Sequence, residues 1–457
     1  MKLVFLINYR QSYRYYSSLI NVCFANGCKI ELWHDYSQNS RVLDVENTPF
    51  FNNSYDGIVY KKLLNKQDLM QNIRKSQNVD YFISHNPVTF LIDKELLEII
   101  NGKWCIIMHG IDSFAQVWHW QYFGYNTQLL QDYDRFFFPY TGSFYKYGLK
   151  WLKKYADRNG KRNYEFFESE KTVVHPIGCT MYDKKLKNID KKTIRNKYKI
   201  SPTKGLLIYL PFPFDPSRAK YTKNGSYAWQ AAFAGIYISG IKSGKRKGVK
   251  IGLKTLLVSA IKKLIYLIKI MGDKEAQIWL IQRWNEPSVF KAIRRFCDNN
   301  NLLLVVKPRK KFSFSEDVYR FADIVIDDDE SQHYPSKLQE LFSIADLAMG
   351  YFTTAVIESV LSGVSFINIE CPGSLLNNDE ARMFFHRYYE GSMYNYKGIV
   401  KNISIPQLIT EFGEKNLNEF NIDSKARKGY MEKYTGLETP TAAERFFEFL
   451  ERKEMLS

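Results

Sequence analysis

Along the first part of the chain, short apolar runs alternate with segments whose apolar residues recur at helical spacing. The runs predict strands, and the segments between them predict helices. Short apolar runs predict strands at residues 2–7, 29–33, 56–60, 81–84, 104–108, 135–138 and 172–174. Apolar residues at helical spacing predict helices at 12–25, 64–77 and 94–100. A regular alternation of strand and helix is typical of a parallel sheet with helices on both faces.

The same pattern starts again after a charged stretch at 184–205, which we interpret as the connection between two domains. A solvated helix is compatible with the same role. Apolar runs then predict strands at 206–210, 302–306, 323–326, 347–349 and 365–369, with mostly helical sequence at 226–299. Residues 405–457 contain two helical stretches, and the last, TAAERFFEFLERK, is expected to pack back across the first domain.

The segment 334–370 has the features of a βαβ unit. A short apolar run ends at Gly350, Thr353 or Thr354 can cap the helix that follows, and Glu358 lies on its first turns. In such a unit the free N–H groups at the helix start face the region above the sheet, where a phosphate or diphosphate can bind. A Thr-Thr pair that only caps a helix gives the same pattern.

Length and composition fit a two-domain α/β protein. The 457 residues exceed one ordinary core, so two domains of about 200 residues each are expected. No apolar run reaches the ~18 residues of a spanning helix, and the chain starts directly with a predicted strand, so we expect a cytoplasmic protein. The six cysteines have no CxxC spacing and are expected to be reduced and mostly buried.

The formal net charge of +17 predicts attraction to an anionic partner. Nucleic acid, an anionic membrane surface, or a nucleotide-activated substrate with a charged acceptor would each fit, and the lack of a nucleic-acid-binding signature places nucleic acid last. Residues 239–270 have a basic, glycine-broken start followed by an amphipathic helix edged by lysines. Such a helix can lie in a membrane interface or face an ordinary core.

Candidate catalytic chemistry begins at His109-Gly110, directly after the predicted strand WCIIM. Open α/β sheets bind ligands at the carboxyl ends of their strands, and an imidazole pKa near neutrality suits removal of a proton from an acceptor hydroxyl. Asp112, His85 and His119 are near in sequence and could orient His109 or replace it. A loop histidine bonded to the backbone is the alternative interpretation.

A second histidine motif, HPIGCTMYD at 175–183, follows the last predicted strand of the first half. We expect this loop to face a cleft between the two domains, although a simple turn also explains its Pro and Gly. The residues assigned to the cleft are Gly110, Asp112, His175, Gly178 and Arg218.

In order and spacing, these motifs resemble the CDP-glycerol glycerophosphotransferase-like group, which belongs to the GT-B glycosyltransferases of bacterial surface polysaccharides. The motifs are His109-Gly110, HPIGCTMYD at 175–183, LPFPFDPSR at 210–218, Lys307-Pro308-Arg309, and ADLAMGYFTTAVIESVLSGVSFINI from Ala345. They cover roughly residues 100–450, and each motif is short.

The resemblance implies a GT-B-like α/β fold, in which two Rossmann-like domains face a central cleft and C-terminal helices pack back on the first domain. We divide the chain into an acceptor domain at 1–190, a nucleotide-donor domain at 203–404 with a basic helical insertion near 226–299, and C-terminal helices at 405–457. The resemblance further implies that no metal or cofactor is needed beyond the nucleotide-activated donor, and that His109 is the catalytic base.

Two positions depart from the family's pattern. Lys307 stands where the family has a second histidine, and the turn from Gly350 to Thr354 replaces an Asp-Tyr-Ser-Ser turn. A lysine neutralises a phosphate but carries protons poorly at neutral pH. We expect the donor phosphates to be held by Lys307, Arg309, Thr353 and Thr354, with Glu358 on a ribose or donor hydroxyl.

We therefore expect a metal-independent glycosyltransferase that moves a sugar from a nucleotide-activated donor to a hydroxyl of a bacterial surface polysaccharide or glycolipid, such as capsule, teichoic acid or lipopolysaccharide. Two alternatives stay open: a polyol-phosphate transferase of the CDP-glycerol type, and a non-catalytic relative that binds membrane or glycan. We expect a cytoplasmic protein in peripheral contact with the inner face of the membrane, and no nucleic-acid partner.

Overall fold

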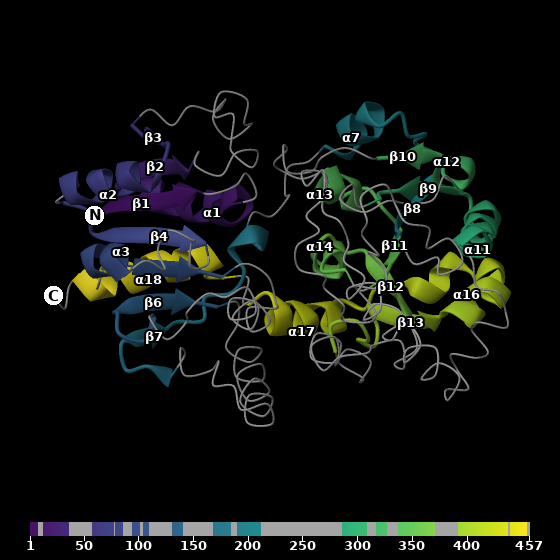
Figure 1. The fold of residues 1–457 in the computed structure, drawn as a ribbon. Helices are drawn as coiled ribbons and strands as arrows, with labels where there is room; N and C mark the ends of the chain where they lie inside the picture. Colours follow the sequence, from purple (N-terminus) through teal and green to yellow (C-terminus); the bar gives the residue numbers. More distant parts are fainter. Residues whose placement is uncertain are drawn as a thin grey trace, which may run out of the picture. The chain divides into compact units, whose positions relative to one another are not determined.

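The structure of the protein, a computed structural model, describes residues 1–7, 12–35, 57–76, 78–85, 94–100, 104–108, 130–139, 168–183, 190–211, 286–308, 317–326, 337–351, 353–370, 392–436 and 439–454. The chain divides into two compact units (Figure 1). The first combines Met1–Lys187, Glu330–Lys337 and Lys428–Ser457, and the second combines Asn188–Asp329 and Leu338–Arg427. The first unit therefore contains both ends of the chain, and most of the sequence between them forms the second unit.

The first unit contains a seven-stranded sheet in the order β3-β2-β1-β4-β5-β6-β7, in which every neighbouring pair is parallel. Its strands are β1 (Lys2–Ile7), β2 (Lys29–Asp35), β3 (Val59–Leu63), β4 (Tyr81–His85), β5 (Trp104–Ile107), β6 (Arg135–Phe138) and β7 (Thr172–Val174). The order 3-2-1-4-5-6 is that of a Rossmann-type sheet, to which β7 adds one edge strand.

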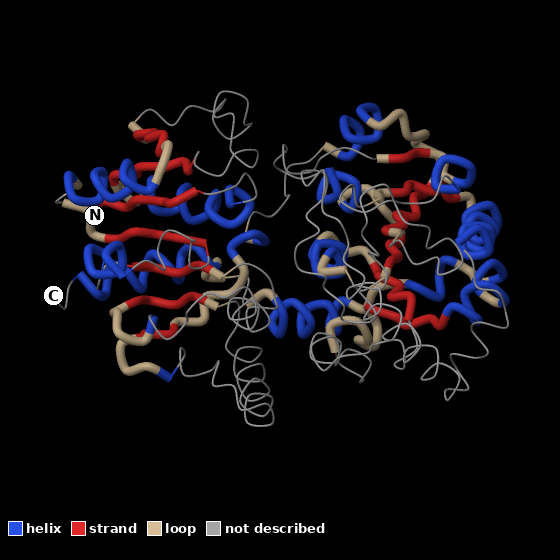
Figure 2. The backbone as a smooth tube through the Cα atoms, viewed as in Figure 1, coloured by secondary structure: helices blue, strands red, loops and turns tan. Residues whose placement is uncertain are grey.

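Helices cover both faces of this sheet. Successive residues of a strand point to opposite faces, so each strand contributes apolar side chains to both layers. Val4 joins a hydrophobic cluster with α2 and α3, whereas Phe5 joins a separate cluster with α1 and α18. Figure 2 shows this layering of strands and helices. The helices are α1 (Ser12–Ala25), α2 (Lys66–Lys75), α3 (Lys94–Ile100) and α18 (Ala442–Glu454). The doubly wound arrangement predicted from the sequence is confirmed.

The C-terminal helix α18 completes the core of the first unit, as its amphipathic sequence predicts. Phe446 and Leu450 are fully buried among residues of α1 and the sheet. Asp183 caps the start of α18, since its carboxylate accepts hydrogen bonds of 2.8 Å from the backbone N–H groups of both Ala442 and Ala443. The end of the chain is therefore part of the same folding unit as its beginning.

The second unit repeats the architecture with a six-stranded sheet in the order β10-β9-β8-β11-β12-β13, again parallel throughout. Its strands are β8 (Gly205–Leu210), β9 (Leu302–Val306), β10 (Ile324–Val325), β11 (Leu347–Gly350), β12 (Ser365–Glu370) and β13 (Val400–Ser404). Counted from β8, this is the same 3-2-1-4-5-6 order. Two Rossmann-like sheets are therefore present in one chain.

Helices also cover both faces of the second sheet. Leu207 of β8 and Met349 of β11 face one side, where they form a cluster with α11, α12 and α16. Val356 of α14 and Leu341 of α13 are buried outside this cluster, which places their helices on the other face. The helices are α11 (Glu286–Asn299), α12 (Asp317–Phe321), α13 (Lys337–Phe342), α14 (Ala355–Leu361) and α16 (Ile405–Thr410).

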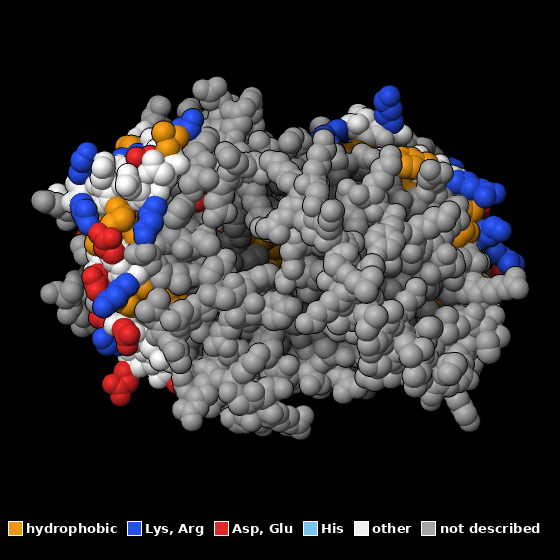
Figure 3. Space-filling view, in the orientation of Figure 1, with side chains coloured by type: hydrophobic (Ala, Val, Ile, Leu, Met, Phe, Trp, Pro, Cys, Tyr) orange, Lys and Arg blue, Asp and Glu red, His pale blue; other side chains and the backbone are white. Residues whose placement is uncertain are grey.

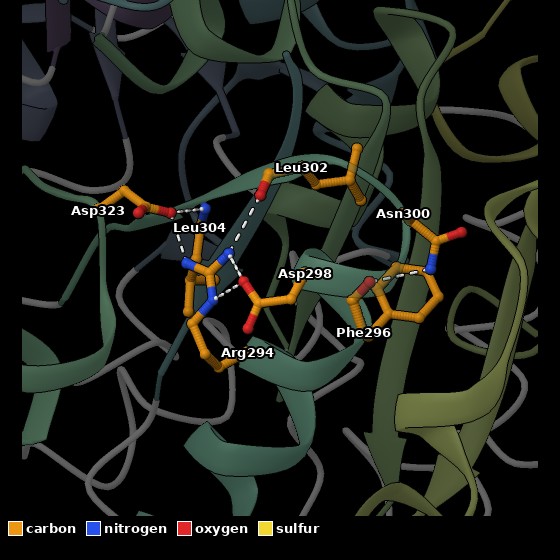
Figure 4. Close-up of polar contacts among 7 residues, drawn as sticks. All are labelled: Arg294, Phe296, Asp298, Asn300, Leu302, Leu304 and Asp323. Atoms are coloured by element: carbon orange, nitrogen blue, oxygen red, sulfur yellow. Dashed lines mark hydrogen bonds and ion pairs between the residues drawn. The ribbon is translucent and has the colours of Figure 1, made fainter.

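Arg294 of α11 joins this helix to the sheet on the side of the strands' amino ends (Figure 4). Its guanidinium donates to Asp298 at 2.9 Å, to Asp323 at 2.5 Å and to the carbonyl oxygen of Leu302 at 3.1 Å. Asp323 also accepts a hydrogen bond of 2.7 Å from the backbone N–H of Leu304. Partial burial acts to lower the pKa of Arg294, but the hydrogen bonds and negative charges of Asp323 and Asp298, together with Cys297, raise it on balance.

Exposed basic residues contribute to the positive charge of the second unit. Figure 3 shows lysine and arginine side chains over α11 and over α7 (Lys191–Lys197). Lys191 and Lys192 of α7, and Lys291 and Arg295 of α11, are exposed. The charged stretch at 184–205 thus contains a short solvated helix, α7, which Asp190 caps by accepting hydrogen bonds from the N–H groups of Lys192 and Thr193.

The strand at β13 was not predicted, because its sequence VKNIS has a weak apolar pattern. Five cysteines in the described part of the chain are free and buried, as expected: Cys23, Cys28, Cys105, Cys179 and Cys297. The basic segment 239–270, and the predicted helical region 226–299 up to residue 285, lie outside the described residues. Within the described part of the chain, none of the helices is long and apolar enough to cross a membrane.

Candidate functional site

The strand order of the second sheet defines a place where ligands bind in proteins of this architecture. The connections leave β8 toward one edge of the sheet and β11 toward the other, so these adjacent central strands form a topological switch point. Open α/β sheets bind ligands outside the carboxyl ends of the strands at this point. Here those ends are Leu210 and Gly350, which are register partners.

Four residues form a row across the sheet at this level. Gly350 pairs with Leu210 on one side and with Asn368 on the other. On the far side of Leu210, Lys307 continues the β9 register by donating its backbone N–H to Tyr209 at 3.0 Å. Because neighbouring strands lie about 4.8 Å apart, Lys307 and Gly350 are about 10 Å apart.

The row faces the α13–α14 side of the sheet. Val306 and Ile369 belong to the cluster on the α11 side, so their neighbours Lys307 and Asn368 point the opposite way. Lys307 is only 7% exposed, and lysines are rarely buried to this extent in proteins. Lys307 therefore lies at the carboxyl end of a central strand, in the region where an anionic ligand would bind in this architecture.

Gly350 is tightly packed against its neighbours in this row. A Cβ atom at this position would lie 3.0 Å from Leu210 Cβ and 3.1 Å from the Leu210 carbonyl oxygen. The Phe366 ring would lie 3.5 Å from the same Cβ, so glycine is the residue that fits between Leu210 and Phe366 at the end of β11.

The turn after Gly350 leads into α14, as the sequence predicts. The Thr353 hydroxyl accepts a hydrogen bond of 3.2 Å from the backbone N–H of Ala355, and Thr354 is exposed at the N-cap position. Glu358 lies in the first turn of α14 and is 6% exposed. The helix ends before Gly363, whose φ of +79° favours glycine.

Sequence reasoning missed Asn368 and its partner. The Asn368 side chain is fully buried, and its Nδ2 donates to Asn402 Oδ1 of β13 at 2.9 Å. The only signal was a single polar residue inside the apolar run SFINIE. Its partner could not be identified, because β13 itself was not predicted.

Several predicted site residues lie outside the described residues. These are His109, Gly110, Asp112, Arg218 and Arg309. The strand that leads to His109 is described: β5 ends at Ile107, whose register partner is His85 at the end of β4. The carboxyl ends of β4 and β5 are therefore adjacent in the first sheet, which is where the sequence predicts the catalytic base.

His175 and Gly178 pack against the C-terminal part of the chain within the first unit. The His175 ring stacks on Phe449 of α18, with ring centroids 4.8 Å apart. Burial, and then the positive charges of Arg452 and Arg445, lower the His175 pKa. A Cβ on Gly178, where φ is +92°, would lie 2.6 Å from the Thr435 carbonyl oxygen. These contacts give both residues a packing role.

A polar pair not singled out from the sequence lies at the carboxyl end of β2. The Tyr13 hydroxyl is 2.6 Å from His34 Nε2, and both residues are buried. Burial lowers the His34 pKa to about 4, so the imidazole is neutral at physiological pH.

This pair gives a test of the first unit. The unfolded chain protonates His34 below about pH 6.5, whereas the folded chain does not until about pH 4. Acidification from pH 7.5 to pH 5 therefore costs about 2 kcal/mol of unfolding free energy at this residue alone. We expect His34→Gln to be less sensitive to acid than the wild type by that amount in urea unfolding.

Comparison of the two proteins cancels the contributions of other groups. One of these is Asp183, whose pKa is raised by burial to about 6, so that its effect on stability runs in the opposite direction. If the unfolding free energies of the wild type and His34→Gln change with pH by the same amount, the prediction is wrong.

No metal site is apparent in the described part of the chain, where His, Cys, Asp and Glu side chains do not gather in groups of three or more. The acidic run 327–330 lies outside the described residues.

Comparison with known proteins finds a match in structure but not in sequence. No protein-family model and no curated protein matches the chain. The wall teichoic acid polymerase TagF matches with a TM-score of 0.50 and 11% identity, over 100% of this chain and 90% of that one. UDP-GlcNAc 2-epimerase from Methanocaldococcus jannaschii matches with a TM-score of 0.52 and 11% identity, over 99% and 100% of the two chains.

A putative UDP-N-acetylglucosamine 2-epimerase from Listeria monocytogenes gives a similar result, with a TM-score of 0.52 and 10% identity over 100% of this chain and 97% of that one. At such low identity the likeness shows the fold alone. The chain has the α/β, GT-B-like fold with two Rossmann-like domains, as the motifs in the sequence predict.

Proposed function

We propose that the protein is a metal-independent GT-B-type glycosyltransferase, which transfers a sugar from a nucleotide-activated donor to a hydroxyl of a bacterial surface polysaccharide or glycolipid. The observation that carries the proposal is the buried Lys307 at the switch point of the second sheet. Its support is the likeness along the whole chain to a wall teichoic acid polymerase and to epimerases whose names specify a nucleotide sugar.

In this proposal the second unit binds the donor. Lys307 and Arg309 neutralise the donor phosphates, and Thr353 and Thr354 provide hydroxyl groups beside them. Glu358 binds a ribose or donor hydroxyl.

The first unit supplies the base. His109 takes the proton from the acceptor hydroxyl as the acceptor oxygen bonds to the transferred group and the bond between that group and the donor phosphate breaks. The departing phosphate carries the developing negative charge, which Lys307 and Arg309 stabilise without a metal ion.

Two alternatives have their own support. Polyol-phosphate transfer is favoured by the teichoic acid polymerase among the structural neighbours. A non-catalytic protein that binds membrane or glycan is favoured by Lys307 in place of the family's second histidine, since a lysine is a poor proton carrier at neutral pH.

The test is a screen of nucleotides and nucleotide-activated sugars and polyols by thermal unfolding. A donor at 100 times its Kd adds about 2.7 kcal/mol to the free energy of unfolding, so we expect one nucleotide class to raise the Tm by several degrees. The stabilising donor is then assayed for nucleotide release with and without glycan acceptors. Stabilisation without release would favour the non-catalytic alternative, and the absence of any nucleotide effect would contradict the proposal.

A further inference from the structure

A pocket separate from the switch point lies beside the edge strand β13 of the second unit. Its volume is about 450 Å³, within the range of about 300–1,000 Å³ that small-molecule sites have. The loop 395–399, the first residues of β12 and β13, and the end of the 3₁₀ helix η9 (Leu417–Phe420) form its walls. It therefore lies toward the amino ends of β12 and β13, whereas the candidate donor site is at the carboxyl ends of β8 and β11.

The charge of this edge pocket is positive. Lys397 and Lys401 line it, and both are exposed. The Lys401 ammonium lies 4.9 Å from the centre of the Phe420 ring, which holds it at the wall.

The one carboxylate of the pocket, Glu419, already has partners outside it. One of its oxygens accepts a hydrogen bond of 2.9 Å from the backbone N–H of Asn416, and the other is 3.2 Å from Lys415 Nζ. Its bonds to Asn416 and Lys415, with a smaller contribution from the charge of Lys401, lower the Glu419 pKa and keep it ionised. Two lysines against this one carboxylate leave the pocket with a net positive charge.

The remaining polar groups suit hydroxyls. Asn395, Asn402, Asn421 and Ser365 line the pocket, and a side-chain amide both donates and accepts hydrogen bonds, as a sugar hydroxyl does. The Asn402 carboxamide oxygen accepts from the fully buried Asn368, which fixes the orientation of that amide.

We propose that the edge pocket binds a phosphate-bearing sugar unit of the acceptor, at a distance from its reacting end. Lys397 and Lys401 bind the phosphate, and the three asparagines and Ser365 bind the sugar hydroxyls. This inference rests on the proposed transferase function, because it assigns the pocket to the acceptor. The pocket holds one part of the acceptor while the reacting hydroxyl of the same acceptor is at the active site, so the acceptor stays bound from one transfer to the next.

The experiment measures binding of glucose 6-phosphate to the full chain by saturation-transfer NMR, with the donor site filled by the nucleotide that stabilises the protein most. We expect saturable binding by the wild type, at least tenfold weaker binding by Lys397→Ala/Lys401→Ala, and no binding of glucose. Lys425→Ala is the matched control, because this exposed lysine of α17 (Ser424–Tyr434) is not among the residues of the pocket. Equal weakening by the control would reduce the effect to general charge and overturn the proposal.

A lipid-linked glycan presents the same chemistry at a membrane, so a second arm uses phosphatidylcholine vesicles with and without phosphatidylinositol. Cosedimentation that depends on phosphatidylinositol and is lost in the double variant places the phosphate on a lipid headgroup. Binding of glucose 6-phosphate alone places it in the glycan. The absence of both overturns the proposal.

The same variants distinguish failure of this inference from failure of the proposed function. Both lysines are exposed, so their removal should lower the Tm by no more than loss of the contact between Lys401 and Phe420 requires, and it should leave the donor-induced Tm shift unchanged. If the pocket acts as proposed, the double variant has a raised KM for long acceptors with an unchanged kcat for short ones. If the wild type transfers sugar and the double variant transfers it equally well to long acceptors, the transferase proposal stands and the role of the pocket is wrong.

Discussion

Lys307→Met should remove most of the stabilisation that the donor nucleotide gives to the wild type. A hydrogen bond to a charged group contributes about 1.5–3 kcal/mol, so its loss corresponds to a Kd about 10–150-fold weaker. Methionine retains the buried stem of the side chain, which separates the loss of charge from a loss of packing. The measurement is the Tm of each protein with increasing nucleotide, relative to its own nucleotide-free Tm.

Two further variants make this result specific to position 307. Lys307→Arg keeps the positive charge and should recover part of the affinity, although a guanidinium differs in shape and donor geometry. Lys425→Ala removes an exposed lysine of the same unit and should leave the Kd unchanged. If Lys307→Met binds the nucleotide as tightly as the wild type, Lys307 is no part of the donor site.

His109→Ala should reduce the rate of transfer about 10²–10⁴-fold, which is the usual contribution of a general base. The donor-induced Tm shift should persist, because the base is assigned to the first unit and the donor to the second. The measurement is nucleotide release in the presence of acceptor, from pH 5.5 to 8.5. A base with a pKa near neutrality makes the wild-type rate fall on the acid side, and the residual rate of the variant should lack this limb.

His85→Ala and His119→Ala are the matched controls, since both histidines are near His109 in the sequence. His85 ends β4 and is the register partner of Ile107, two residues before His109. If either control loses the acid limb while His109→Ala retains it, the role of base passes to that histidine. An unchanged rate in all three variants would contradict base catalysis from this edge of the first sheet.

The sequence predicts the central strands of both sheets well because each is a short apolar run bounded by polar or glycine residues. Leu302–Val306, for example, has the boundaries in the structure that its apolar pattern indicates, and the same pattern places Lys307 just past its end. Gly350 at the end of β11 was predictable for the same reason. Local pattern is sufficient here because these strands are buried on both faces.

The edge of the second sheet could not be predicted in this way. Lys401 and Asn402 interrupt the apolar pattern of β13, which an edge strand tolerates because one side of it is not covered by another strand. The contact between Asn368 and Asn402 joins residues 34 positions apart, and the pairing of Tyr13 with His34 also depends on the folded sheet. Such contacts come from tertiary structure, which neither composition nor periodicity contains.

The position of α18 in the core of the first unit affects how the chain can be made and divided. Phe446 and Leu450 come after the whole second unit in the sequence, yet they are buried against residues of the first. During synthesis, one face of the N-terminal sheet stays uncovered until the second unit and then α18 have been made. A fragment that stops in the 184–205 segment would expose that apolar face to water and to other chains, so it should aggregate unless a peptide covering 439–454 is added back.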